Sequence, residues 1–183
     1  MINNSKILLF LFGTFLFWNY PTIAQNNRMV KSNSYNLLLK KLLKHDVPEI
    51  SIDSLHKINE TVLLLDAREI AEFNVSHLNN AEYVGYKTFN IDSLRNTNKN
   101  QPIVVYCSVG YRSEKITEKL MNAGFTNVKN LYGGIFEWKN KKLDVYDAKG
   151  LTNNVHPYNS TWGIWLKNAD KVYKTPDLST QKK

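Results

Sequence analysis

The chain has 183 residues, of which 43% are hydrophobic and 22% are charged, and this composition suits one globular domain with short extensions. The formal net charge is +8, but the lysines are dispersed and their densest cluster is KNKK at residues 139–142. No nucleic-acid-binding motif accompanies them, so we predict a solvated basic surface and no nucleic-acid partner. The four histidines are far apart and the single cysteine forms no CxxC pair, so we predict no metal site and no cofactor.

The first segment has the pattern of a secretory signal peptide. Lys6 precedes an apolar run at residues 7–18, and a polar break with the small-residue pattern TIA follows it. The run is shorter than the roughly 20 apolar residues that a membrane span requires. We therefore expect residues 1–24 to be removed before Gln25, leaving a periplasmic or secreted protein with no stable membrane insertion. An uncleaved membrane anchor is the alternative.

A helical arm is expected next, at residues 25–46. Its segment NSYNLLLKKLLKHD has the spacing of an amphipathic helix, with lysines distributed around it. The apolar side of this helix consists of Leu38, Leu39, Leu42 and Leu43.

Strand-like and helix-like segments then alternate along the chain. The alternation predicts an α/β domain with a central parallel sheet flanked by helices. Expected strands are PEISI (48–52), TVLLLDAR (61–68), AEYVGY (81–86), PIVVYC (102–107) and TNVKNLYGG (126–134). Expected helical segments are SLHKIN (54–59, with Asp53 as N-cap), EIAEFN (69–74), IDSLRN (91–96), EKITEKLMNAGF (114–125) and IFEWKNKK (135–142).

The single cysteine, Cys107, ends one of these strands. Ligands bind at the carboxyl ends of strands in such sheets, where loops lead into helices. The loop that follows consists of Ser108, Val109, Gly110, Tyr111 and Arg112. Its glycine allows the backbone N–H groups to turn inward, and the next helix adds a positive end, so a thiolate or an anionic persulfide is favoured. The alternative is an inert core cysteine.

Four motifs together resemble a single rhodanese domain at residues 47–142. They are CSVGYRS after a buried strand, LLDARE with Glu72 close behind it, NVSHLNNA, and LYGGIFEW. The resemblance implies the rhodanese fold and sulfurtransferase chemistry. In that family, the loop cysteine takes a sulfane sulfur from a donor such as thiosulfate and holds it as a persulfide. It then passes the sulfur to a nucleophilic acceptor such as a thiol or cyanide. For this chain we expect a thiol-type acceptor, either a small thiol or a thiol of a partner protein.

The same resemblance suggests roles for individual residues. Cys107 corresponds to the catalytic nucleophile, and residues 108–112 correspond to the substrate-binding loop. Asp66 and Arg68 match the family's Asp-x-Arg element, which braces neighbouring loops, and Glu72 is expected either to pair with a basic group near the loop or to face solvent. His77 stands at the family's histidine position, but its neighbours depart from the usual glycine and proline pattern, so a structural role is expected.

Several alternatives stay open. Cysteine-based phosphatases and arsenate reductases are less favoured, because phosphatases usually place five residues between cysteine and arginine, and here there are four. A rhodanese-fold carrier or binding module without turnover is a second alternative. Only Arg112 charges the loop positively, so a persulfide or polysulfide is a more natural donor than thiosulfate. Arg112 either braces the loop through a carboxylate or binds an anionic donor, and we favour bracing.

Residues 143–183 form a C-terminal extension beyond the domain. It contains four large apolar or aromatic residues that a plain tail would leave in water, namely Tyr158, Trp162, Ile164 and Trp165. We expect the extension to pack on the domain.

Overall fold

The computed structural model describes residues 29–174. The predicted signal peptide and its cleavage point before Gln25 lie outside the described residues. Among residues 29–174, no helix is long and apolar enough to cross a membrane.

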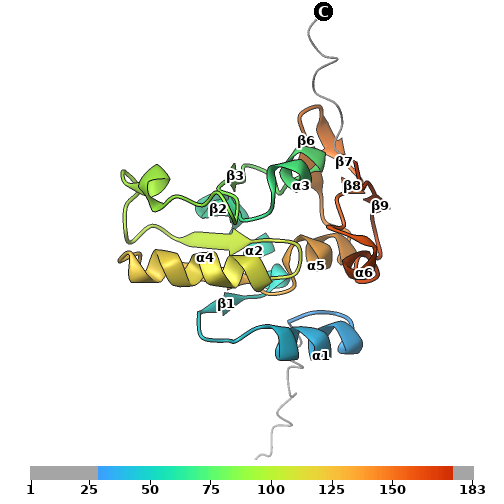
Figure 1. Cartoon of the computed structure of the whole chain (residues 1–183), viewed down its shortest axis with the longest axis horizontal. Helices are drawn as coiled ribbons and strands as arrows, with labels where there is room; N and C mark the ends of the chain where they lie inside the picture. Colours follow the sequence, from blue (N-terminus) through green and yellow to red (C-terminus); the bar gives the residue numbers. More distant parts are fainter. Residues whose placement is uncertain (1–28, 175–183) are drawn as a thin grey trace, which may run out of the picture.

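A five-stranded parallel sheet forms the centre of the molecule (Figure 1). Its strand order is β1-β5-β4-β2-β3, and each neighbouring pair is parallel. The strands are β1 (Glu49–Ile50), β2 (Leu63–Asp66), β3 (Glu82–Tyr83), β4 (Ile103–Tyr106) and β5 (Val128–Leu131). The prediction of an α/β fold with a central parallel sheet flanked by helices is therefore confirmed.

Alternating side chains of the central strands contribute to two separate cores, as the two-residue period of a strand requires. On one face, Leu65, Ile103 and Val105 pack against α4 (Tyr111–Asn122) and the 3-10 helix η2 (Ile91–Leu94). The larger core covers the opposite face of β2 and β4. Because both faces of these strands are covered, their sequences are continuously apolar.

The opposite face carries the larger core. Leu64 and Val104 belong to it, together with buried residues of three helices and of the C-terminal extension. The helices are α1 (Asn33–Leu42), α2 (Ile52–His56) and α5 (Gly134–Asn140).

Short elements complete the described chain. They are η1 (Asn59–Thr61), α3 (Ile70–Val75), β6 (Val145–Asp147), β7 (Gly150–Thr152), β8 (Asn154–Val155), α6 (Ser160–Gly163) and β9 (Asp170–Lys171). Strands β6 and β7 form an antiparallel hairpin, and β8 pairs with β9.

Two expected helix starts were wrong. Helix α2 begins at Ile52, with Ser51 rather than Asp53 as its N-cap, because the Ser51 side chain accepts a hydrogen bond from the Ser54 N–H. Helix α4 begins at Tyr111, three residues before the expected Glu114.

The C-terminal extension, which includes α6, lies against the core on the side of α5 (Figure 1). Leu166 is fully buried, and Trp165 stacks on Tyr35 of α1 with ring centroids 5.4 Å apart. Tyr158 and Ile164, in contrast, stay 50% and 53% exposed, so the expectation that they are buried was wrong.

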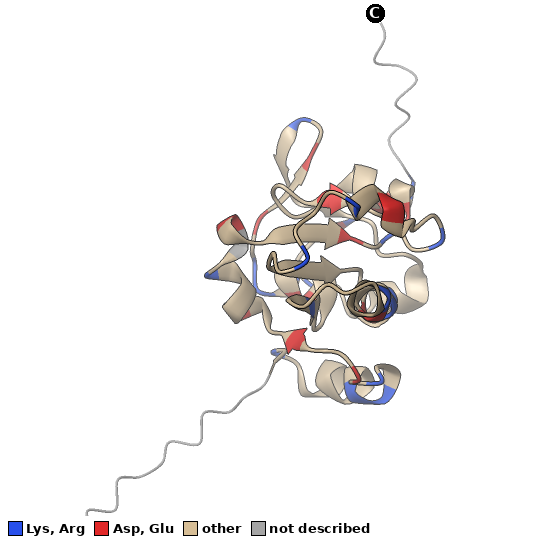
Figure 2. Ribbon diagram, turned by 90° about the vertical axis from the view of Figure 1, so that its left-hand side faces the viewer, with Lys and Arg blue, Asp and Glu red and all other residues tan. Residues whose placement is uncertain are grey.

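Charged residues are spread over the described ribbon (Figure 2). Lys40 and Lys41 lie in the last turn of α1, and Lys119 lies in the last turn of α4. Acidic positions are interspersed among the basic ones in this view.

Candidate active site

Cys107 directly follows β4 and is almost completely buried, with 1% of its surface exposed. Its Sγ accepts a hydrogen bond from the Gly110 N–H at 3.2 Å. The Cys107 carbonyl accepts from the Ile135 N–H at 2.9 Å, and the Ser108 carbonyl accepts from the Phe136 N–H at 3.1 Å. The first residues of α5 therefore hold the start of the cysteine loop, by which we mean residues 107–112.

Gly110 makes the turn that places its N–H on the sulfur. Its φ of 114° and ψ of −15° lie in the left-handed region, where a side chain would be strained. The Gly110 carbonyl oxygen is 3.1 Å from both Ser113 Oγ and Asn130 Nδ2. This left-handed turn also lets α4 start at Tyr111, so Tyr111 and Arg112 belong to the first turn of the helix.

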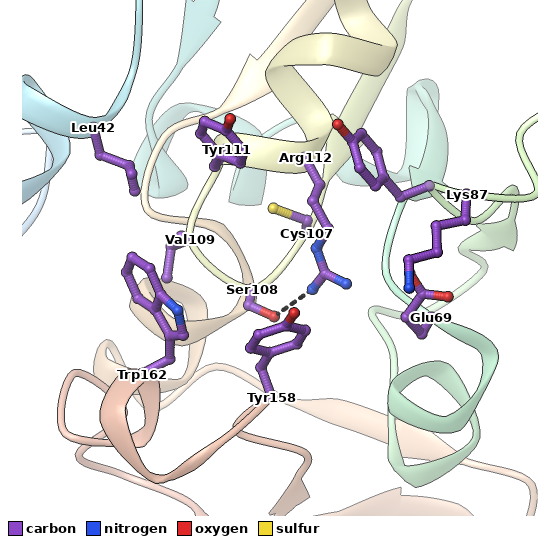
Figure 3. A pocket seen from close by; sticks show the side chains of 11 residues that line it. Leu42, Glu69, Lys87, Cys107, Ser108, Val109, Tyr111, Arg112, Tyr158 and Trp162 are labelled. Carbon is purple, nitrogen blue, oxygen red and sulfur yellow. Dashed lines mark hydrogen bonds between the residues drawn. The ribbon is translucent and has the colours of Figure 1, made fainter.

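Glu72 of α3 is the centre of the hydrogen bonds beside the cysteine loop. Its two carboxylate oxygens accept from Arg112 Nη1 at 2.6 Å and Nη2 at 2.8 Å. Ser108 Oγ donates to Glu72 Oε1 at 2.8 Å, and Arg112 Nη2 is 3.0 Å from Ser108 Oγ (Figure 3). The structure thus places Arg112 in the bidentate arrangement expected of a brace.

This environment keeps Glu72 ionised. Burial raises the pKa of Glu72, but the hydrogen bonds and charge of Arg112, with the charge of Arg68 and the Glu69 N–H, outweigh burial and lower the pKa to about 2. Burial lowers the pKa of Arg112, but its hydrogen bonds to Glu72 outweigh that effect and raise the pKa above its usual value.

Asp66 and Arg68 form a second, fully buried ion pair at the end of β2. Arg68 Nη2 donates to Asp66 Oδ2 at 2.7 Å and also to the Ser76 carbonyl at the end of α3. Burial lowers the pKa of Arg68, but the charge and hydrogen bonds of Asp66 outweigh it and raise the pKa. The pair connects β2 to the end of the helix that carries Glu72.

His77 lies outside the cavity above Cys107. Its backbone forms an antiparallel bridge with Tyr146, and its ring stacks on Phe73 with centroids 4.1 Å apart. Its Nδ1 is 3.2 Å from the Phe73 carbonyl oxygen. These are packing contacts, in keeping with the structural role expected for this residue.

A cavity of about 310 Å³ lies above the cysteine loop (Figure 3). Gly110 is the only residue of the loop that does not line it. The cavity is lined by Leu42, Glu69, Tyr86, Lys87, Cys107, Ser108, Val109, Tyr111, Arg112, Tyr158 and Trp162.

Six of these lining residues were not predicted to form the site: Leu42, Glu69, Tyr86, Lys87, Tyr158 and Trp162. They come from segments distant in sequence from Cys107, and the aromatic content of the C-terminal extension was the only signal of such a contribution. Within residues 29–174, no group of three or more metal-ligating side chains exists.

The rhodanese-like domain family model matches residues 51–141. The chain therefore contains a rhodanese-like domain, and its match lies within the predicted boundaries of 47 and 142. The cysteine loop, Glu72 and the Asp66–Arg68 pair all belong to the matched segment.

Curated relatives share this part of the chain. The tRNA uridine(34) hydroxylase of Photorhabdus laumondii is 35% identical over 88 residues, which are 45% of this chain and 25% of that protein. The adenylyltransferase and sulfurtransferase UBA4 of Meyerozyma guilliermondii is 34% identical over 105 residues, 53% of this chain and 24% of that protein. The chain thus covers about a quarter of the length of these relatives.

Solved structures support the same fold. The BH2092 protein of Bacillus halodurans superimposes with a TM-score of 0.52 at 24% identity, covering 64% of this chain and 86% of that one. A thiosulfate sulfurtransferase of Pseudomonas aeruginosa gives a TM-score of 0.52 at 18% identity, covering 60% of this chain and 22% of that one.

Proposed function

We propose that this chain is a sulfurtransferase in which Cys107 accepts a sulfane sulfur, holds it as a persulfide and passes it to a thiol-type acceptor. The observation that carries the proposal is the position of the thiol. Cys107 lies at the carboxyl end of β4 and lines a cavity, and its Sγ accepts a hydrogen bond from the Gly110 N–H at 3.2 Å. One curated relative over this segment is named as an adenylyltransferase and sulfurtransferase, and that name supports the same chemistry.

The proposed reaction has two displacement steps. In the first, the Cys107 thiolate attacks the outer sulfur of the donor, the donor's S–S bond breaks, and the electron pair leaves with the remainder of the donor. In the second, an acceptor thiolate attacks the outer sulfur of the Cys107 persulfide and restores the thiolate. The Gly110 N–H and the first turn of α4 stabilise the anionic sulfur between the steps.

The charges around the loop favour particular donors. Residues 108–111 are uncharged, and the Arg112 guanidinium is already paired with Glu72. A dianion such as thiosulfate therefore finds little unpaired positive charge in the loop, so a persulfide or polysulfide is the proposed donor. The acceptor is a small thiol or a thiol of a partner protein.

Intact mass spectrometry tests the proposal. Because Cys107 is the only cysteine in the chain, a gain of one sulfur after exposure to polysulfide or thiosulfate is attributable to it. We expect the gain to be reversed by a thiol and to be absent in Cys107→Ala. No gain with any donor would refute the proposal, and a gain without repeated turnover would favour the carrier alternative.

We also propose that the chain acts after export, in the periplasm or outside the cell. The support is the pattern of residues 1–24, with a lysine, a short apolar run and a small-residue site. The expected mature protein begins at Gln25. N-terminal sequencing of the protein recovered from each cell fraction tests this expectation. Full-length chain held tightly in membranes would contradict export by cleavage.

A further inference from the structure

One side of the cavity above Cys107 is built from segments outside residues 51–141. Leu42 comes from α1, and Tyr158 and Trp162 come from the C-terminal extension. In Figure 3, Leu42 and Trp162 lie on the same side of the cysteine loop. We call these three residues the apolar wall.

The apolar wall is held in place by specific contacts. Trp162 and Leu42 both pack against the larger core, and the Trp162 N–H donates to Asn159 Oδ1 at 3.0 Å. The Tyr158 N–H donates to His156 Nδ1 at 3.0 Å, and Tyr158 itself has a φ of 66°. A left-handed tyrosine costs conformational energy, so the surrounding contacts must hold this turn.

The one charged lining residue that lies against the apolar wall is already paired with a carboxylate. Arg112 is paired with Glu72, and its guanidinium carbon lies 5.1 Å from the Tyr158 ring centroid, so Tyr158 covers part of that cation. The other charged lining residues, Glu69 and Lys87, lie on the opposite side of the cavity from Trp162 (Figure 3). The cavity therefore has an apolar side and a polar side.

The cavity volume limits the ligand. At about 310 Å³, it lies at the lower end of the range for small-molecule sites, so it suits a ligand of modest size. A donor whose outer sulfur reaches Cys107 has room for one ring or branched alkyl group against Trp162.

We propose that the apolar wall binds an aromatic or branched apolar substituent of the sulfur donor, so that the chain selects organic sulfane-sulfur donors over thiosulfate. This inference rests on the proposed function and specifies its substrate class. With an organic persulfide, R–S–SH and the Cys107 thiolate give the Cys107 persulfide anion and R–SH. The donor's S–S bond breaks, a bond forms to Cys107 Sγ, and the proton of the outer sulfur moves to the leaving sulfur.

A matched donor series tests the inference. Thiosulfate, methanethiosulfonate and benzenethiosulfonate all transfer one outer sulfur, and the two thiosulfonates leave as sulfinates with the electron pair of the broken S–S bond. No proton or oxidant is needed for that step. We expect kcat/KM for benzenethiosulfonate to exceed that for methanethiosulfonate by about tenfold or more, because a hydrophobic pocket discriminates apolar groups by such factors.

Substitution of Trp162 separates the apolar wall from the rest of the site. Trp162→Ala is expected to lower kcat/KM for benzenethiosulfonate about tenfold and to change the values for the other two donors less than about twofold. Trp162→Phe is expected to restore most of the loss. Ile164→Ala is the matched control, because Ile164 is 53% exposed in the same extension and does not line the cavity.

A binding measurement distinguishes failure of this inference from failure of the proposed function. Benzenesulfinate is expected to protect Cys107 from alkylation at lower concentration than methanesulfinate, and Trp162→Ala is expected to remove the difference. Three results would each overturn the proposed role of the apolar wall. They are equal rates with all three donors, an equal loss of rate for all donors in Trp162→Ala, and equal protection by the two sulfinates. If benzenesulfinate protects Cys107 from alkylation but no donor forms a persulfide, the proposed function is overturned, while the apolar wall still binds the aromatic group.

Discussion

Glu72 connects two residues of the cysteine loop, Arg112 and Ser108. It accepts hydrogen bonds from Arg112 Nη1 and Nη2 and from the Ser108 hydroxyl, and it is 2% exposed. A buried carboxylate in such a network stabilises the fold only while its partners are present, because removal of one partner leaves an uncompensated charge.

The lowered pKa of Glu72 predicts a specific dependence of stability on pH. Since the pKa falls from 4.5 to about 2 on folding, the stabilisation is fully present above about pH 4.5 and is lost as pH falls through about 2. The shift corresponds to about 3 kcal/mol, at about 1.4 kcal/mol per pKa unit. Glu72→Gln should therefore cost about 3 kcal/mol at pH 7, and urea denaturation should show the difference from wild type narrowing below pH 4.5. A difference that does not change with pH would contradict this role.

Two substitutions of Arg112 distinguish a role in bracing the cysteine loop from a role in binding the sulfur donor. If it braces the loop through Glu72, Arg112→Lys cannot reproduce the bidentate pairing, so Arg112→Lys and Arg112→Ala should both slow transfer from thiosulfate and from a neutral organic trisulfide. Arg112→Ala should also lower the free energy of unfolding by about 3 kcal/mol, because Glu72 is left unpaired. A defect confined to thiosulfate, with an unchanged melting temperature, would show that Arg112 binds the donor instead.

At the scale of elements, helix α5 holds the cysteine loop from the side opposite α4. The N–H groups of Ile135 and Phe136 bind the carbonyls of Cys107 and Ser108, and Gly134 lets the two backbones approach closely. A Cβ on Gly134 would clash with both carbonyl oxygens. Gly134 thus contributes directly to the position of the cysteine loop.

Gly134→Ala should lower the free energy of unfolding by about 3 kcal/mol, through the clash and through a φ of 56° that disfavours a side chain. Gly124→Ala is the matched control. Gly124 also has a positive φ of 87°, but a Cβ there meets nothing within 4 Å, so it should cost only about 1 kcal/mol. Equal losses in chemical denaturation would mean that the close approach of α5 to the loop is unimportant.

The elements also indicate which parts of the structure could be predicted from sequence. Strands β2 and β4 were recognisable because a strand buried on both faces is a continuous apolar run. The start of α4 was missed, because the left-handed turn at Gly110 allows a helix to begin at once, whereas the sequence SVGYR resembles a longer loop. Local pattern therefore identified the elements better than it placed their ends.

At the scale of the whole molecule, the rhodanese-like domain and the segments around it contribute differently to the site. The cysteine loop, Glu72 and the Asp66–Arg68 pair come from residues 51–141. These residues could be recognised in the sequence from the order of the motifs that contain them. The apolar wall could not be predicted, because contacts between distant segments leave no periodic pattern in the sequence. Tyr158 was expected to be buried in packing, yet it stays half exposed and lies over Arg112.

The most direct test of the central claim follows an isotopic label through Cys107. A donor labelled with heavy sulfur at its outer position should load the label onto Cys107, and an added thiol should then receive it at the rate at which the persulfide disappears. With excess donor and acceptor, many labelled products should form per protein chain, and Cys107→Ser should form none above the uncatalysed reaction. Label that reaches the thiol without a Cys107 persulfide, or at the same rate in Cys107→Ser, would contradict the account.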